Sequence, residues 1–205
     1  KRRDPTKPGF WFLSYCHPHP PLVPLQCYLD LYRDCDIAAP YSGDWAEDDE
    51  SLPYALRARR RDSSWMDPRH IRAARLAFYA MCTHIDHQLR LIIGTLREEG
   101  LLDNTAILFT SDHGDMLGNH GLWAKRLFYE DSANVPMILS GPGSEGRVGH
   151  HRTDNRLVGW QDVMPTLLDL AGIEPPDTVE GLSMVGTTRR DALYGECGEG
   201  APATR

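Results

Sequence analysis

Residues 105–115 have the sequence Thr105-Ala106-Ile107-Leu108-Phe109-Thr110-Ser111-Asp112-His113-Gly114-Asp115. The apolar part, 105–110, follows a turn at Asp103-Asn104 and predicts a buried strand. A carboxylate and an imidazole leave the end of this strand together, and Gly114 permits a sharp turn. Because mixed oxygen and nitrogen ligands suit a divalent cation, Asp112 and His113 are candidate metal ligands. Two ligands are not a site, and a capped turn with a surface histidine is the simpler interpretation of these residues alone.

The sequence on either side of this segment predicts alternating strands and helices. Residues 69–99 carry an apolar stripe at helical spacing, which predicts an amphipathic helix. A second helix is predicted at 161–170. Further strands are predicted at 10–16, 135–139 and 192–194. This alternation predicts an α/β fold with a largely parallel sheet flanked by helices, in which chemistry collects at the carboxyl ends of the strands.

Two segments are predicted to lack regular structure. His17-Pro18-His19-Pro20-Pro21 contains too many prolines for a helix or a central strand, so both histidines are placed on a stiff loop. Residues 40–68 carry an acidic run followed by a basic run, which indicates a solvated surface insertion. Either His17 or His19 is compatible with a functional role, and simple packing within the loop is the alternative for both.

Composition narrows the class of protein. The net charge of −7 and the pI of about 5.7 argue against a nucleic-acid-binding protein. The five cysteines form no CxxC pair, so free or buried thiols are expected and the redox compartment stays open. The sequence contains no window of 18 apolar residues, so no transmembrane helix is predicted. The sequence after Lys1 does not have the pattern of a signal peptide. Localisation and oligomeric state are not predicted.

A longer pattern surrounds the Asp112-His113 pair. The chain continues through Met116-Leu117-Gly118-Asn119-His120-Gly121-Leu122-Trp123-Ala124-Lys125-Arg126 to Val135-Pro136 and Gly141-Pro142-Gly143. This pattern resembles the sulfatase family of the alkaline phosphatase superfamily. The likeness continues in Phe12-Leu13-Ser14-Tyr15, Thr83-His84-Ile85-Asp86, Asp162-Val163-Met164-Pro165-Thr166 and Tyr194-Gly195-Glu196. It covers nearly the whole chain and implies an alkaline-phosphatase-like sandwich, incomplete at both ends.

The resemblance implies roles for individual residues. Asp112 and His113 match the family's later pair of metal ligands, with Ca²⁺ expected first and Mn²⁺ next. Lys125 matches the lysine that contacts the sulfate oxygens, and His19, more than His17, matches the histidine near the leaving-group oxygen. A solvated lysine is the alternative for Lys125. His120 is expected to support the metal loop or to stack beside Trp123, Glu130 to start a short helix, and His150-His151 to lie on the surface.

The family's nucleophile segment, Cys/Ser-x-Pro-Ser/Ala-Arg with its formylglycine, has no match here, because Cys16-His17-Pro18 continues with His19-Pro20. The first pair of metal ligands is also unmatched. The expectation is therefore that residues 1–205 are part of one sulfatase catalytic domain, that the parent hydrolyses small-molecule or saccharide sulfate esters, and that this chain alone is inactive. The loop from Tyr41 to Trp65 is expected to help set specificity. A phosphonate or phosphodiester hydrolase and a non-catalytic remnant are the alternatives.

Overall fold

The structure is a computed structural model that describes residues 4, 7–48, 50–63, 67–142, 148 and 151–195. The chain divides into two compact units. Unit 1 consists of Lys1–Leu13, Arg97–Asp112 and Pro136–Arg205, and unit 2 consists of Ser14–Leu96 and His113–Val135. Each unit is built from segments that are distant in the sequence.

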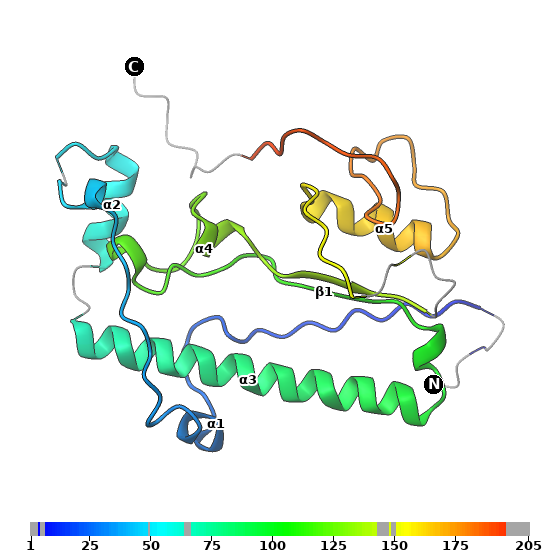
Figure 1. Cartoon of the computed structure of the whole chain (residues 1–205), viewed down its shortest axis with the longest axis horizontal. Coiled ribbons are helices and arrows are strands. Elements are labelled where there is room, and N and C mark those ends of the chain that lie inside the picture. The colour runs from blue at the N-terminus through cyan, green and yellow to red at the C-terminus, as the bar shows by residue number, and fades with distance from the viewer. Residues whose placement is uncertain are drawn as a thin grey trace. The chain divides into compact units, whose positions relative to one another are not determined.

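The sheet lies in unit 1 and contains two strands, β1 (Ile107–Thr110) and β2 (Met137–Ser140), which run side by side in Figure 1. The strands are antiparallel, with Leu108 opposite Leu139. The predictions of strands at 105–110 and 135–139 are therefore confirmed. The predicted parallel sheet is not found among the described residues, because an apolar run specifies a strand without specifying the direction of its neighbour.

The strands predicted at 10–16 and 192–194 are wrong, since neither segment forms a strand in the structure. Phe10 is 73% exposed and Phe12 is 76% exposed, so the aromatic run is not buried either. A strand needs hydrogen bonds to a neighbouring strand, and no described strand pairs with these residues. The aromatic composition indicated the tendency of the first segment but not whether a partner would be present.

The predicted helix at 161–170 is confirmed by the short 3₁₀ helix η4 (Trp160–Asp162) and helix α5 (Val163–Leu170) in unit 1. Asp162 is 1% exposed and sits where the two helices join. Its carboxylate accepts hydrogen bonds from the backbone N–H of Gly159 at 2.8 Å and of Leu182 at 2.8 Å, and from the Arg190 guanidinium at 2.6 Å. This buried charge is therefore paired, which is the condition for stable burial.

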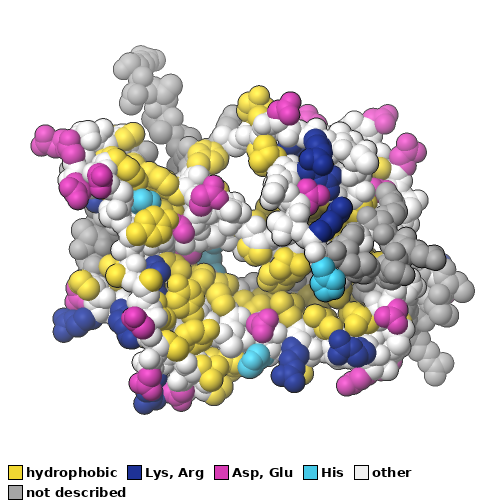
Figure 2. All heavy atoms as spheres, in the orientation of Figure 1, with side chains coloured by type: hydrophobic (Ala, Val, Ile, Leu, Met, Phe, Trp, Pro, Cys, Tyr) yellow, Lys and Arg dark blue, Asp and Glu magenta, His cyan; other side chains and the backbone are white. Residues whose placement is uncertain are grey.

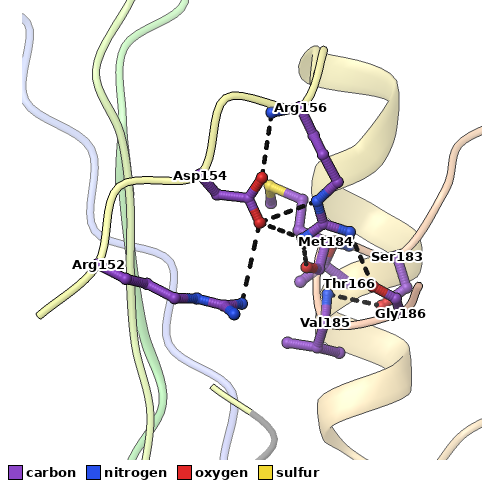
Figure 3. A network of polar contacts seen from close by, with 8 residues as sticks. All are labelled: Arg152, Asp154, Arg156, Thr166, Ser183, Met184, Val185 and Gly186. Atoms are coloured by element: carbon purple, nitrogen blue, oxygen red, sulfur yellow. Dashed lines mark hydrogen bonds and ion pairs between the residues drawn. The ribbon is translucent and has the colours of Figure 1, made fainter. Parts of the chain in front are cut away.

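A second arginine joins two loops of unit 1 (Figure 3). The Arg156 guanidinium donates to the carbonyl oxygens of Gly186 and Met184, each at 2.7 Å, and to the Asp154 carboxylate at 2.9 Å. Arg152 approaches the same carboxylate from the other side, as Figure 3 shows. Hydrogen bonding to Arg156 lowers the pKa of Asp154. Arg156 thus holds two irregular segments together where neither has secondary structure of its own.

The main element of unit 2 is helix α3 (Pro68–Glu98), whose last two residues belong to unit 1. It confirms the predicted helix at 69–99. Asp67 caps its start by accepting hydrogen bonds from the backbone N–H of Arg69 at 2.8 Å and of His70 at 3.0 Å. Proline at the first position fits because that N–H has no partner in a helix, and Gly100 follows the helix with a φ of 65°.

Unit 2 also contains shorter elements. They are α1 (Gln26–Asp30), η1 (Asp44–Ala46), α2 (Tyr54–Ser63), η3 (Asn119–Gly121) and α4 (Glu130–Ala133). Figure 1 shows α1 beside the middle of α3, and the following Tyr32 hydroxyl lies 2.6 Å from that of Thr83. The prediction that 40–68 is irregular is wrong for α2. The sequence of α2 is rich in arginine and lacks a clear apolar stripe, so it did not show the apolar spacing from which a helix is predicted.

Large hydrophobic side chains are widely exposed on the face that Figure 2 shows. The exposed set in the described chain includes Phe10, Phe12, Tyr54, Leu91, Phe128, Ile138 and Tyr194. Buried apolar side chains also exist in unit 2, where Met81, Met116 and Leu122 are fully buried. No helix of the described residues is both long and apolar enough to cross a membrane.

Candidate active site

His19 lies in the proline-rich turn of unit 2, where the sequence predicted a stiff loop. Its backbone N–H donates to the Cys16 carbonyl oxygen at 3.0 Å, and its Nδ1 lies 2.8 Å from the Pro20 carbonyl oxygen. A carbonyl oxygen only accepts hydrogen bonds, so Nδ1 carries the proton in this contact. Nε2 is therefore the nitrogen that has a lone pair when the ring is neutral.

Lys125 reaches that nitrogen from the far end of another loop. Its Nζ lies 2.7 Å from the Nε2 of His19. An ammonium group only donates, so Lys125 is the donor and neutral His19 is the acceptor. The carbonyl oxygen of Lys125 accepts a long hydrogen bond from Arg59 at 3.5 Å. The two residues that the resemblance selected as catalytic are thus in direct contact.

His113 is the third member of this group. Its ring centroid lies 6.0 Å from that of His19, and its Nδ1 lies 2.6 Å from the Gly114 carbonyl oxygen. As with His19, this contact assigns the proton to Nδ1 and the lone pair to Nε2. Metal-binding histidines commonly donate their second ring N–H to a backbone carbonyl in this way, so the geometry of His113 fits a metal ligand.

Gly114 lets the chain pass close to the backbone of helix α4 after His113. Its N–H donates to the Ser132 carbonyl oxygen at 2.9 Å. A Cβ atom built on Gly114 would lie 2.0 Å from the Asp131 carbonyl oxygen, far closer than non-bonded atoms can approach. Only glycine allows helix α4 to pack this closely against the residue that follows His113.

Asp115 connects the His113 and Lys125 ends of the loop. Its Oδ1 accepts hydrogen bonds from the backbone N–H of Leu117 at 3.0 Å and of Ala124 at 3.1 Å. Desolvation by burial raises the pKa of Asp115, opposed by the two backbone hydrogen bonds and by the charges of His113 and Lys125. The sequence analysis assigned no role to Asp115, although its position two residues after His113 placed it in the candidate metal-binding loop.

Asp112 follows strand β1 as the last residue of its segment in unit 1, and the peptide bond to His113 leads into unit 2. Within unit 1, the Trp160 indole N–H donates to the carbonyl oxygen of the preceding residue, Ser111, at 2.8 Å. In the part of the chain that the structure describes, no three His, Cys, Asp or Glu side chains come close enough to hold a metal ion. Asp112 and His113 therefore form at most part of a metal site here.

The other histidines lie in different surroundings. The His17 ring is 6.1 Å from His84 on α3, so the structure places His19, and not His17, against Lys125. The rings that contact His120 are those of Tyr41, Trp45 and Tyr129, so the alternative of stacking beside Trp123 is not found, and the preferred supporting role stays a prediction. His151 is exposed as expected, and His150 lies outside the described residues.

Comparison with known sequences gives consistent matches. A family model described as Sulfatase matches residues 1–173. An arylsulfatase of Clostridium perfringens is 40% identical over 206 residues, which is 96% of this chain and 42% of that protein. A choline-sulfatase of Rhizobium meliloti is 38% identical over 188 residues, which is 89% of this chain and 36% of that protein. The chain therefore spans less than half the length of these curated relatives.

Comparison with solved structures agrees. A phosphonate monoester hydrolase from Silicibacter pomeroyi superposes with a TM-score of 0.71 and 29% sequence identity, over 82% of this chain and 34% of that one. The shared architecture and the sequence matches lead to the same assignment, which confirms the resemblance read from the loop between β1 and β2. This chain belongs to the sulfatase family.

Proposed function

We propose that this chain is part of a metal-dependent sulfatase that hydrolyses small-molecule or saccharide sulfate esters. The observation that carries the proposal is the 2.7 Å contact between Lys125 Nζ and His19 Nε2, with the His113 ring beside His19. A sulfuryl group in transfer develops negative charge on its oxygens and on the leaving alkoxide. Cationic and proton-donating side chains gathered at one place match those needs.

Lys125 has the role of binding the oxygens of the sulfuryl group through its ammonium. His19 has the role of holding the proton that the departing alkoxide requires, at Nε2. The Nδ1–H contact with the Pro20 carbonyl oxygen fixes the ring so that Nε2 faces Lys125. The contact between the two side chains keeps the Lys125 ammonium beside the nitrogen that has this role.

Asp112 and His113 would hold a divalent cation, with Ca²⁺ proposed first and Mn²⁺ next. The hydrogen bond from His113 Nδ1 to the Gly114 carbonyl oxygen supports this, since it leaves the lone pair on Nε2. When bound, the cation supplies charge neutralisation at the sulfuryl oxygens. The remaining ligands of the cation and a formylglycine nucleophile belong to the proposed parent protein. Residues 1–205 form part of a single catalytic domain in this proposal, with 40–68 as an insertion. The isolated chain is accordingly inactive in this proposal.

A second candidate is hydrolysis of phosphonate or phosphodiester esters. The solved structure of a phosphonate monoester hydrolase that superposes on this chain favours it. Lys125, His19 and a divalent cation would serve a phosphoryl group in the same way, so these residues do not separate the two reactions. A non-catalytic remnant that keeps the fold is the third possibility.

The test begins with the reading frame that precedes the codon for Lys1. An in-frame Cys-x-Pro-Ser-Arg segment would support a sulfatase with a formylglycine nucleophile, a threonine there would favour phosphoryl transfer, and a stop codon would favour the remnant. The protein encoded by the whole frame is then assayed on aryl sulfate and aryl phosphonate esters. Faster turnover of the phosphonate would overturn the first proposal, and turnover by the isolated 205-residue chain would overturn its inactivity.

A further inference from the structure

The loop between His113 and Lys125 has an unusual backbone. Four non-glycine residues near or within it have positive φ angles: Leu117 at 46°, His120 at 57°, Ala124 at 63° and Arg126 at 76°. Each such conformation costs roughly 1–2 kcal/mol for a residue with a side chain. Strain of this kind persists only where surrounding contacts impose it, and it concentrates at functional sites. The loop therefore requires a strong anchor.

The anchor is visible at the tip of the loop. The backbone N–H of His120 donates to the Tyr41 carbonyl oxygen at 2.7 Å, and the Gly43 N–H donates to the Nδ1 of His120 at 3.1 Å. The Tyr41 N–H donates to the side-chain oxygen of Asn119 at 3.3 Å. Because a peptide N–H only donates, Nδ1 of His120 must be an acceptor, and the ring carries its proton on Nε2. This arrangement requires a neutral imidazole.

Three aromatic rings enclose that imidazole, which is 8% exposed. Their centroids lie 4.9 Å (Tyr41), 4.9 Å (Trp45) and 5.2 Å (Tyr129) from that of His120. Trp45 and Tyr129 are themselves stacked, with an angle of 4° between their planes. The Asp131 carboxylate accepts hydrogen bonds from the Tyr41 hydroxyl at 2.5 Å and from the Asn119 amide at 3.1 Å. His120 is thus fixed by packing against three aromatic rings and by the hydrogen bond at its Nδ1.

Hydrogen bonds join the two sides of the loop, residues 116–118 before His120 and residues 122–124 after it. The Gly118 N–H donates to the Leu122 carbonyl oxygen at 2.9 Å, and the Met116 N–H donates to that of Ala124 at 2.8 Å. Asp115 bonds to the N–H of Ala124 as well. Residues 122–124, which lead from the tip of the loop to Lys125, are therefore held in place by hydrogen bonds.

We propose that His120 is a positioning residue that fastens the tip of this loop to Tyr41 and Gly43 and so holds Lys125 against His19. This goes beyond the proposed function and rests on it only for the catalytic role of Lys125. The proposed role is positioning rather than direct catalysis, since the Gly43 N–H occupies Nδ1 of His120 and three aromatic rings pack against the imidazole. The segment Tyr41–Trp45 thereby becomes structurally coupled to the reactive lysine.

Three variants of the chain separate this role from general packing. His120→Asn keeps an acceptor near the position of Nδ1, and asparagine tolerates a positive φ well. His120→Gln places its amide further out, where it does not meet the Gly43 N–H. His120→Ala removes the acceptor and the ring together. Circular dichroism establishes which variants are folded, and His120→Gln and His120→Asn keep the test decisive if His120→Ala does not fold.

The principal readout is NMR of the 205-residue chain, which requires no turnover. The expected results are an Nε2–H tautomer for His120, and His19 ring resonances that move in His120→Gln and His120→Ala towards their positions in Lys125→Ala. Those resonances should stay near wild type in His120→Asn. An Nδ1–H tautomer for His120, or unchanged His19 resonances in a folded His120→Gln variant, would overturn the proposal.

The same variants in the protein encoded by the whole reading frame give the kinetic readout. His120→Gln should lower kcat for an aryl sulfate by about 10-fold or more, since a misplaced catalytic group is costly. In a Lys125→Ala background the same change should have little further effect. An equal loss in both backgrounds would contradict positioning of Lys125. A protein without sulfatase activity that still gives the expected NMR result would refute the proposed function and leave the positioning role intact.

Discussion

The Nζ of Lys125 lies 2.7 Å from the Nε2 of His19, although 106 positions separate the two residues in the chain. Two groups this close cannot both carry a full positive charge without strong repulsion. Their direct contact is expected to make the two side chains act as a unit. This has direct consequences for how the two side chains respond to substitution.

If Lys125 and His19 act as a unit, their substitutions should not be additive. Lys125→Ala and His19→Ala should each lower kcat for an aryl sulfate by roughly 100-fold or more, the scale of a lost acid–base or charge-stabilising group. The double variant should lose little beyond the larger single effect. Steady-state kinetics of the protein encoded by the whole reading frame measures this. His17→Ala serves as the control, and multiplication of the two single effects would show that the residues act independently.

Asp115 should stabilise the loop through hydrogen bonding by one oxygen. Asp115→Ala leaves the N–H groups of Leu117 and Ala124 without that acceptor and should lower the free energy of unfolding by about 1–3 kcal/mol. Asp115→Asn retains an oxygen in the same place and should lose much less. Urea unfolding of the chain gives the energies, and amide exchange at Leu117 and Ala124 locates them. Equal destabilisation by both substitutions would contradict this explanation.

The Asp154–Arg156 contact predicts a dependence of stability on pH. Hydrogen bonding to Arg156 lowers the pKa of Asp154 in the folded state below its unfolded value of about 3.9. The stabilisation is therefore present above that unfolded value and is lost as the pH falls through the lower, folded pKa. Thermal unfolding of wild type and Asp154→Asn should differ by a constant amount near neutral pH, and the difference should shrink under acid conditions. A difference that persists unchanged at low pH would exclude the carboxylate as its source.

Removal of the buried carboxylate at Asp162 should be among the most damaging changes in unit 1. Asp162→Ala leaves the Arg190 guanidinium and the N–H groups of Gly159 and Leu182 without their acceptor. Breaking a buried ion pair in this way costs about 3–5 kcal/mol. Chemical denaturation measures the loss. The exposed Asp154→Asn variant provides a comparison, and a smaller effect for Asp162→Ala than for that variant would be inconsistent with the structure.

The sequence predicted the elements whose signals are local. The apolar stripe of 69–99 and the start signal at Asp67-Pro68 located α3, and the run at 105–110 located β1 together with the Asp112-His113 loop. The exposed segment 10–16 was mispredicted because strand formation depends on a partner that the segment itself does not encode. Helix α2 was not predicted because its sequence is dominated by arginine and shows no clear apolar stripe.

The site was predictable only in part. The residue types of Asp112 and His113 made them candidate metal ligands, but a capped turn was the simpler interpretation until the family resemblance was considered. Lys125 and His19 were selected through that resemblance. No pattern in the sequence indicates that a residue near the start of the chain meets one near position 125, because such contacts arise from the path of the whole chain. The packing of His120 against Tyr41 and Trp45 was unpredictable for the same reason.

The contact between Gly114 and the Asp131 carbonyl oxygen has a consequence for how this protein can vary. Any base change that alters a glycine codon without ending the chain adds a side chain, and even alanine would place a carbon 2.0 Å from that oxygen. No single substitution at position 114 is therefore compatible with this packing. A mutational library built to change the substrate should therefore leave Gly114 fixed.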